Sequence, residues 1–229
     1  MDTSLLLVGL ARDGAAIGHL AASDLDRPVP TCGDWTVRDV VDHLAESYRF
    51  WRDVVEHRRT APDQVPDSAR RPDEDAIVVY QHELAACERT LAQADPDAVH
   101  WTWAGPRNPS FVTRRLAHET AVHLWDIGEA LGEPIELDVD LADDGVAEFV
   151  AVIGAESRRG PAVNGRVEFL VAETGKVYRT QGMGDADVVV SGPAADLLLV
   201  LWGRLPVDTV EVEGNAAVLH RYLDGEGLR

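Results

Sequence analysis

The chain has 229 residues and an ordinary apolar content of 45%, so it is long enough for one large or two small domains and is neither fibrous nor disordered. Its 21 basic and 40 acidic residues give a formal net charge of −19, which repels nucleic acids and anionic membranes over the surface as a whole. The only early apolar run, residues 5–10, has no basic residue before it, and no later run is long enough to span a membrane, so the sequence predicts a cytoplasmic protein.

The first 131 residues have the spacing of four amphipathic helices, with small or apolar residues every three or four positions. Thr36 and Asp39 have the spacing of a box-like cap, which places the start of the second helix at Thr36. Gly132 is typical of a residue that ends a helix, here the fourth. The pattern predicts a four-helix bundle. Its helices cover about residues 7–21, 36–55, 73–94 and 110–131, with a proline-rich loop at 60–73.

The rest of the chain has a mixed pattern of helix and strand. Segments 166–174 and 176–181 alternate around a Thr-Gly turn, which predicts a β-hairpin. With a boundary between residues 132 and 140, the sequence predicts an α+β fold: a helical domain at 1–135 and a smaller α+β domain at 136–229. Further strands are predicted at 187–191 and 209–213, and further helices at 141–157, 192–204 and 215–223.

Two polar residues share the apolar side of the fourth helix. At about 100° per residue, Glu119 and His123 lie about 40° apart on adjacent turns, on the side that should pack against other helices. A buried carboxylate is costly unless something compensates its charge. A metal ion does so, but a hydrogen bond between the two side chains, or exposure of both, explains the spacing as well. The apolar residues on that side are Val112, Leu116, Ile127 and Leu131.

His43 in the second helix is a third candidate ligand. It lies beside Leu44 at the edge of that helix's apolar side, where it can face the interior of the same bundle. Two histidines and one carboxylate leave a coordination position open, as in catalytic zinc sites. We therefore predict that His43, Glu119 and His123 bind a divalent ion, with Zn²⁺ as the first choice. Asp126, three residues after His123, is predicted to orient the imidazole from behind.

Other polar residues carry weaker signals. Arg115, one turn before Glu119, is a candidate anchor for an anionic substrate, although an arginine on a helix flank usually faces water. Cys32 precedes a helix start, where a thiol is sometimes activated, but a small buried cysteine is the commoner case. Cys32 and Cys87 form no CxxC pair, so neither a disulfide framework nor a thiolate metal cluster is predicted. Trp35 either lines a pocket mouth or caps the core.

The remaining six histidines are predicted to be solvated or structural. His118 lies about 140° from His123 around the helix, too far to share one ion, and His82 lies off the apolar side of its helix. The other four have no acidic or imidazole partner at ligand spacing on a shared face: His19, His57, His100 and His220.

Two N-terminal segments carry a resemblance to a known family. Residues 29–39 read VPTCGDWTVRD and lead to His43, and residues 118–126 read HETAVHLWD. They resemble the mycothiol-dependent maleylpyruvate isomerase family, whose N-terminal domain is a DinB-like metal-binding four-helix bundle. The segments GPAADL (192–197) and VEVEGN (210–215) resemble the sterol-carrier-like C-terminal domain of that family. The resemblance covers nearly the whole chain and implies metal ligands at His43, Glu119 and His123.

The resemblance also implies a thiol cofactor. A divalent ion would stabilise the thiolate of mycothiol, which adds to a maleyl double bond in an isomerase or attacks another electrophile in an S-transferase. The implied partners are a small-molecule substrate and a low-molecular-weight thiol. Twenty arginines against one lysine, Lys176, are typical of a GC-rich genome and agree with an actinobacterial source that makes mycothiol. The alternative is a non-catalytic protein with a structural metal, whose C-terminal domain binds an apolar ligand against the helix at 197–202.

Overall fold

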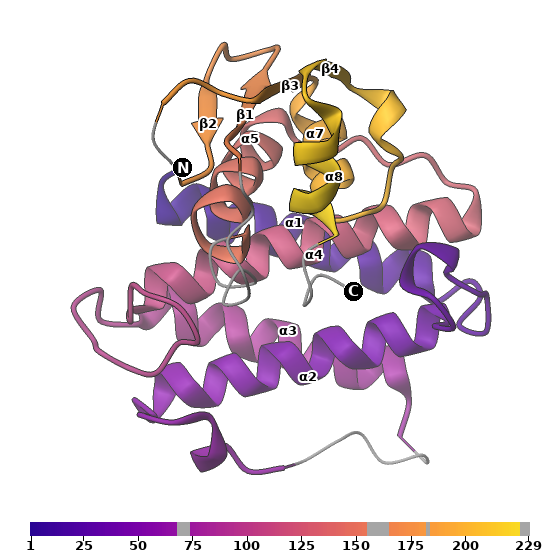
Figure 1. Cartoon of the computed structure of the whole chain (residues 1–229). Helices are drawn as coiled ribbons and strands as arrows, with labels where there is room; N and C mark the ends of the chain where they lie inside the picture. Colours follow the sequence, from indigo (N-terminus) through magenta and orange to yellow (C-terminus); the bar gives the residue numbers. More distant parts are fainter. Residues whose placement is uncertain (68–73, 155–164, 182–183, 225–229) are drawn as a thin grey trace. The chain divides into compact units, whose positions relative to one another are not determined.

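The computed structural model describes residues 1–67, 74–154, 165–181 and 184–224 of the chain. The chain divides into two compact units, residues 1–136 and residues 137–229. In Figure 1 the long helices of the first unit run from indigo to pink, and the strands of the second are orange to yellow.

Four long helices make up the first unit. They are α1 (Thr3–Ala21), α2 (Val37–Glu56), α3 (Ala76–Gln93) and α4 (Pro109–Leu131), with short 3₁₀ turns η1 (Pro30–Cys32) and η2 (Pro62–Gln64) in the connections. Both α1 and α2 contact α3 and α4, so each helix has two main neighbours and the bundle closes on itself. The predicted four-helix bundle is confirmed. The predicted start of the third helix, residue 73, lies outside the described residues.

The starts of α2 and α4 are fixed by side-chain caps. Thr36 Oγ1 accepts a hydrogen bond from the backbone N–H of Asp39 at 3.4 Å, and the Asp39 carboxylate accepts one from the N–H of Thr36 at 2.7 Å. This is the predicted capping box. At α4 the side chain of Asn108 accepts from the N–H of Phe111 at 3.1 Å, and Gly132, with φ 73°, ends the helix in the left-handed conformation.

Helix α4 buries more of its surface than its sequence pattern predicted. It packs against both α1 and α2, so polar residues outside the predicted stripe are also enclosed. His118 and Thr120 are both 0% exposed, whereas Leu131, which was predicted to be buried, is half-buried at the end of the helix. In contrast, the predicted apolar stripe of α2 is confirmed. Its residues Val37, Val41, Leu44, Tyr48, Trp51 and Val55 are all buried.

Helix α1 is the one described helix that is long and apolar enough to cross a membrane, judged by length and composition alone. It packs against α3 and α4, and Gly14 lies so close to Leu84 that a Cβ atom at position 14 would come within 2.7 Å of the leucine side chain. The helix also contains Asp13, which is 5% exposed and paired with Arg12 at 2.7 Å. Core helices of bundles pass the same composition test, so it is weak support for a membrane span.

The second unit is a mixed four-stranded sheet with helices. The strand order is β2-β1-β3-β4, in which β1 is parallel to β3 and the other neighbours are antiparallel. Helices α7 and α8 contact β1 and β3. The elements are α5 (Val139–Glu148), the π-helical turn η3 (Phe149–Ile153), β1 (Val167–Val171), β2 (Val177–Arg179), β3 (Val188–Gly192), α7 (Ala194–Leu201), the 3₁₀ turn η4 (Val207–Thr209), β4 (Glu211–Gly214) and α8 (Ala216–Leu223).

The predicted elements of this unit are present, with shifted ends. The hairpin is β1–β2, and the last strand begins at Glu211 rather than 209 because η4 occupies the residues before it. The helix expected at 141–157 begins at Val139 and passes from α-helix into the π-helical turn; its predicted end, Ser157, lies outside the described residues. The α+β fold class is therefore confirmed.

Candidate metal centre

The bundle brings together the three side chains predicted as metal ligands. His43 comes from α2, and Glu119 and His123 come from adjacent turns of α4. One ligand atom from each lies within 4.8 Å of the other two, and His43 Nε2 is 2.9 Å from Glu119 Oε1. The two imidazole rings meet edge to face with centroids 5.3 Å apart. The three donors can therefore reach a single ion.

Neighbouring residues set the charge of Glu119. Ser47, one turn after His43 on α2, donates a hydrogen bond to Glu119 Oε1 at 3.2 Å. Arg115 Nε lies 3.7 Å from Glu119 Oε2. Burial raises the pKa of this carboxyl, but the hydrogen bond with His43 and the charge of Arg115 outweigh it and lower the pKa to about 2. The carboxylate is therefore ionised at neutral pH, as a metal ligand must be.

Arg115 lies at the site but not on the solvated flank of the helix. Its residue exposure is 6%, and it pairs with the Glu119 carboxylate on the next turn of α4. A buried guanidinium paired in this way offsets the charge of the carboxylate. Its role as an anchor for an anionic substrate stays a prediction.

Asp126 lies directly behind His123. Its side chain is fully buried, and Oδ2 is 2.9 Å from His123 Nδ1. A carboxylate only accepts hydrogen bonds, so Nδ1 is the donor of this pair. In a neutral imidazole with this tautomer, Nε2 has the lone pair. Asp126 Oδ1 also accepts a hydrogen bond from Thr31 Oγ1 at 2.6 Å, and Oδ2 accepts one from Cys32 Sγ at 3.3 Å.

Trp35 forms an aromatic wall beside the two histidines. Its ring centroid is 5.2 Å from that of His43 and 6.4 Å from that of His123, and the second pair is stacked at 23°. The residue is 37% exposed, so one part of it covers the imidazoles while another part faces outward. The sequence left two roles open for Trp35, lining a pocket mouth or capping the core. In the structure its ring lies beside the candidate site.

The donor set and its hydrogen bonds fit a divalent metal ion. His123 presents Nε2 while a carboxylate holds Nδ1, the arrangement typical of histidines that bind metals. His43 Nε2 must carry a proton to bond with Glu119 in the absence of metal. An ion bound by both residues would take the place of that proton, so binding releases it and weakens at low pH. Two nitrogens and one oxygen suit Zn²⁺ and leave room for a further ligand.

Three residues of this site were missed from the sequence or given another role: Thr31, Cys32 and Ser47. Ser47 had a detectable signal, because it lies four positions after His43 on the same face of α2. Cys32 was considered only as a possible reactive thiol, and nothing in the sequence indicated that Thr31 and Cys32 contact Asp126, because they lie in a short 3₁₀ turn 95 and 94 residues away from it.

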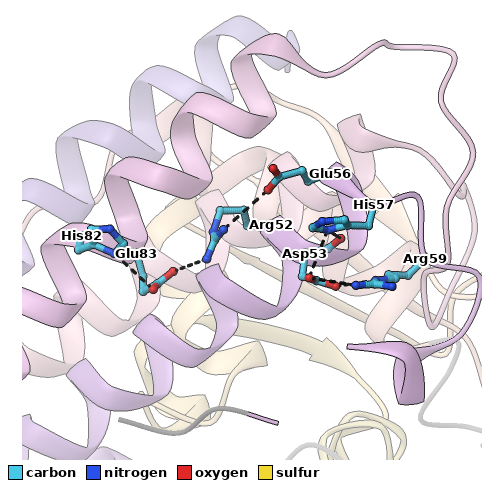
Figure 2. Close-up of polar contacts among 7 residues, drawn as sticks. All are labelled: Arg52, Asp53, Glu56, His57, Arg59, His82 and Glu83. Carbon is cyan, nitrogen blue, oxygen red and sulfur yellow. Dashed lines mark hydrogen bonds and ion pairs between the residues drawn. The ribbon is translucent and has the colours of Figure 1, made fainter. Parts of the chain in front are cut away.

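Two of the remaining histidines lie in two separate groups of ion pairs, one at the end of α2 and one between α2 and α3 (Figure 2). His57 was expected to have no acidic partner at ligand spacing, and this is wrong: Asp53, one turn earlier, lies 3.2 Å from its Nδ1. Asp53 also binds Arg59 Nε at 2.7 Å. His82 lies 3.4 Å from Glu83, beside the ion pair of Glu83 with Arg52. His57 and His82 are exposed, in agreement with their predicted solvation.

Two protein-family models match the chain. Residues 9–128 match the mycothiol maleylpyruvate isomerase N-terminal domain, and residues 140–221 match the C-terminal domain of the same family. The first match spans most of the bundle and all residues of the candidate metal centre. The second spans the mixed sheet and its helices.

Known proteins and solved structures also resemble the chain. An uncharacterized protein of Mycobacterium tuberculosis, Rv0738 in strain H37Rv, is 27% identical over 151 residues, which are 64% of this chain and 76% of that protein. Its counterpart MT0763 in strain CDC 1551 has the same values. The crystal structure of a mycothiol-dependent maleylpyruvate isomerase has a TM-score of 0.66 at 16% identity, and that of its histidine-to-alanine variant 0.68 at 15%. Each covers 93% of both chains, so the whole fold is shared.

Proposed function

This chain belongs to the mycothiol maleylpyruvate isomerase family, and on that premise we propose that it is a metal-dependent enzyme that uses a low-molecular-weight thiol, mycothiol, as its cofactor. The reaction is either a cis-trans isomerisation of the maleylpyruvate type or the transfer of the thiol to an electrophile. The observation that carries the proposal is the convergence of His43, Glu119 and His123, whose ligand atoms lie within 4.8 Å of one another.

Each residue of the site has a defined task in this proposal. His43, Glu119 and His123 hold the ion, and Asp126 keeps the Nδ1 proton of His123 so that Nε2 faces the metal. When bound, Zn²⁺ or a similar ion would keep the sulfur of the thiol deprotonated at neutral pH and so supply the nucleophile. The chain's own cysteines are then not needed as nucleophiles.

Two further residues would shape the substrate position. Trp35 lies against both histidine rings and forms an aromatic wall on one side of the site. Arg115 is a cation beside Glu119, and a carboxylate of an anionic substrate that reached the metal would come under the influence of its charge. We place the reaction in the cytoplasm, where low-molecular-weight thiols are kept reduced.

Metal analysis tests the site. Protein purified without chelator should contain about one equivalent of zinc, and His123→Ala should lose most of it. His82→Ala is the matched control, because that histidine is exposed on α3 and contacts Glu83 rather than the site. Full metal retention by a folded His123→Ala protein would contradict the assignment of the ligands.

Cobalt substitution separates the enzyme from the non-catalytic alternative. Mycothiol added to the Co²⁺ protein should produce a sulfur-to-metal charge-transfer band, since the open position then binds a thiolate. A silent spectrum would favour the apolar-ligand alternative. In the second unit, residues 197–201 of the segment that motivated that alternative are 0–2% exposed, as expected of side chains that fill a core, and Trp202 is half-buried. A screen of maleylpyruvate and electrophiles with metal-loaded protein then distinguishes isomerase from S-transferase.

A further inference from the structure

The carboxylate of Asp126 joins two segments that are far apart in the sequence. It lies on α4 and is 0% exposed. Oδ1 accepts the hydroxyl of Thr31 at 2.6 Å, and Oδ2 accepts both His123 Nδ1 at 2.9 Å and the thiol of Cys32 at 3.3 Å. Two of these three donors come from the 3₁₀ turn η1, whereas His123 lies on the same helix as the carboxylate.

The Thr31 hydrogen bond restricts how the carboxylate can turn. A carboxyl group rotates about its bond to Cβ unless both oxygens have fixed partners. Because Thr31 occupies Oδ1 and Cys32 shares Oδ2, the acceptor that faces His123 Nδ1 is held in place. The proton on Nδ1 then has a fixed acceptor, and in the neutral imidazole the ring orientation and the lone pair on Nε2 are fixed with it.

The segment that carries these donors is itself anchored at both ends. Pro28 pairs with Thr36 in an isolated β-bridge, and the backbone N–H of Val29 donates to the carbonyl of Trp35 at 2.8 Å. Inside this loop, Gly33 has φ 72°, a positive value that glycine adopts more readily than other residues. The Thr31 hydroxyl is therefore presented by a closed loop rather than by a free strand.

We propose that Thr31 and Cys32 are positioning residues for His123 that act through Asp126, with Thr31 as the dominant one. The proposal rests on the proposed function, since it assigns these residues to the same metal centre. It also assigns Cys32 to the positioning of Asp126 rather than to the binding of a metal. Cys32, Asp126 and His123 lie close enough to form a second ligand set, but His123 Nδ1 cannot both donate its proton to Asp126 and bind a metal.

The test compares Thr31→Val, which removes the hydroxyl and keeps the shape, with Thr31→Ser, which keeps the hydroxyl. Proton–nitrogen correlation spectra of the imidazoles in metal-free protein report the His123 tautomer directly. We expect the Nδ1–H form in wild type, a mixture of forms in Thr31→Val, and return of the Nδ1–H form in Thr31→Ser. Thr36→Val is the control, because it removes a hydroxyl of the same loop that bonds to Asp39 and not to Asp126.

Cobalt affinity gives a second readout. Thr31→Val should bind Co²⁺ about 10- to 100-fold more weakly than wild type, the usual effect of losing a group that orients a ligand, whereas Thr31→Ser should stay close to wild type. Cys32→Ala should have a smaller effect. An unchanged tautomer in Thr31→Val would overturn the proposal even where the metal binds normally.

Two outcomes separate this proposal from its premise. If wild-type protein bound no metal, the proposed function would fail, while the tautomer spectra of the metal-free protein would still decide the role of Thr31. If Co²⁺ protein without added thiol had a sulfur charge-transfer band that Cys32→Ser abolished, Cys32 would be a metal ligand and the positioning role would be wrong.

Discussion

His43 Nε2 and Glu119 Oε1 lie 2.9 Å apart, so one hydrogen bond joins α2 to α4 where the candidate ligands meet. The bond holds two would-be ligands in contact before any ion is present. In the metal-free protein it also compensates the buried charge of Glu119, together with Arg115 at 3.7 Å. The same contacts therefore bring two candidate ligands together and stabilise the bundle.

The stability of the metal-free protein should depend on pH through Glu119. Burial raises its pKa, but the His43 bond and the Arg115 charge lower it to about 2. Since the pKa is about 4.3 in an unfolded chain, the ionised carboxylate stabilises the fold above that pH and loses its contribution as the pH falls toward 2. By urea unfolding, Glu119→Gln should be less stable by on the order of 3 kcal/mol at pH 7.

The comparison across pH is the decisive part of this experiment. The difference in unfolding free energy between wild type and Glu119→Gln should be constant from pH 7 to about 5 and should shrink below about 4. Glu56→Gln is the control, because Glu56 forms an exposed ion pair with Arg52 at 3.7 Å. Its free energy of unfolding should differ from that of wild type by no more than about 0.5 kcal/mol at every pH. A Glu119→Gln difference that did not change with pH would contradict the role assigned to the carboxylate.

Asp53 provides a separate pH-dependent contribution at the end of α2 (Figure 2). A hydrogen bond from Arg59 lowers the pKa of Asp53 and outweighs its partial burial. The Arg59 carbonyl in turn accepts the N–H of Trp101 at 2.6 Å, so this pair also anchors the loop before α4. We expect Asp53→Asn to destabilise the protein by about 1 kcal/mol at neutral pH.

The sign of the Asp53 effect follows from its lowered pKa. The ionised Asp53 carboxylate stabilises the fold at pH values above its unfolded-state pKa of about 3.9. This stabilisation is lost as the pH falls through the lower pKa of the folded state. The free energies of unfolding of wild type and Asp53→Asn, measured by chemical unfolding, should therefore converge below about pH 4. Convergence at alkaline pH instead would show that Arg59 binds something other than this carboxylate.

Trp35 should report metal binding by fluorescence. Its ring lies 5.2 Å from that of His43, so a paramagnetic ion held by the histidines would quench it strongly. We expect Co²⁺ to quench a distinct part of the emission in wild type and to have little effect in Trp35→Phe. Trp103→Phe is the control, because Trp103 packs against Phe111. Equal quenching in wild type and Trp35→Phe would place the bound ion elsewhere.

How much of the site could be predicted from the sequence depends on how far apart its residues lie along the chain. Glu119 and His123 could be predicted together because about four residues make one turn of a helix, and His43 because it borders the apolar side of α2. The contacts of Thr31 with Asp126 could not, since only the folded loop brings them to 2.6 Å. Periodicity also underestimated the burial of α4, because the pattern of one helix does not specify how many neighbours it has.

Because the chain divides into two compact units, we predict that residues 1–136 bind the metal without the rest of the chain. All residues of the candidate site, from Thr31 to Asp126, lie in this unit, as do the bundle helices α1 to α4. A fragment of residues 1–136 should therefore keep its helical circular dichroism and bind one equivalent of Co²⁺ with wild-type affinity.

The control for the fragment is the same span of residues with His123→Ala, which should fold and bind little Co²⁺. If the wild-type fragment folded but bound no metal while the full chain did, the second unit would be required for the centre, and the independence of the bundle would be disproved. If the fragment bound metal but failed to bind mycothiol, the ligands would lie in the first unit and thiol recognition would require residues after 136. The cobalt charge-transfer band, recorded with added mycothiol for the fragment and for the full chain, measures this difference directly.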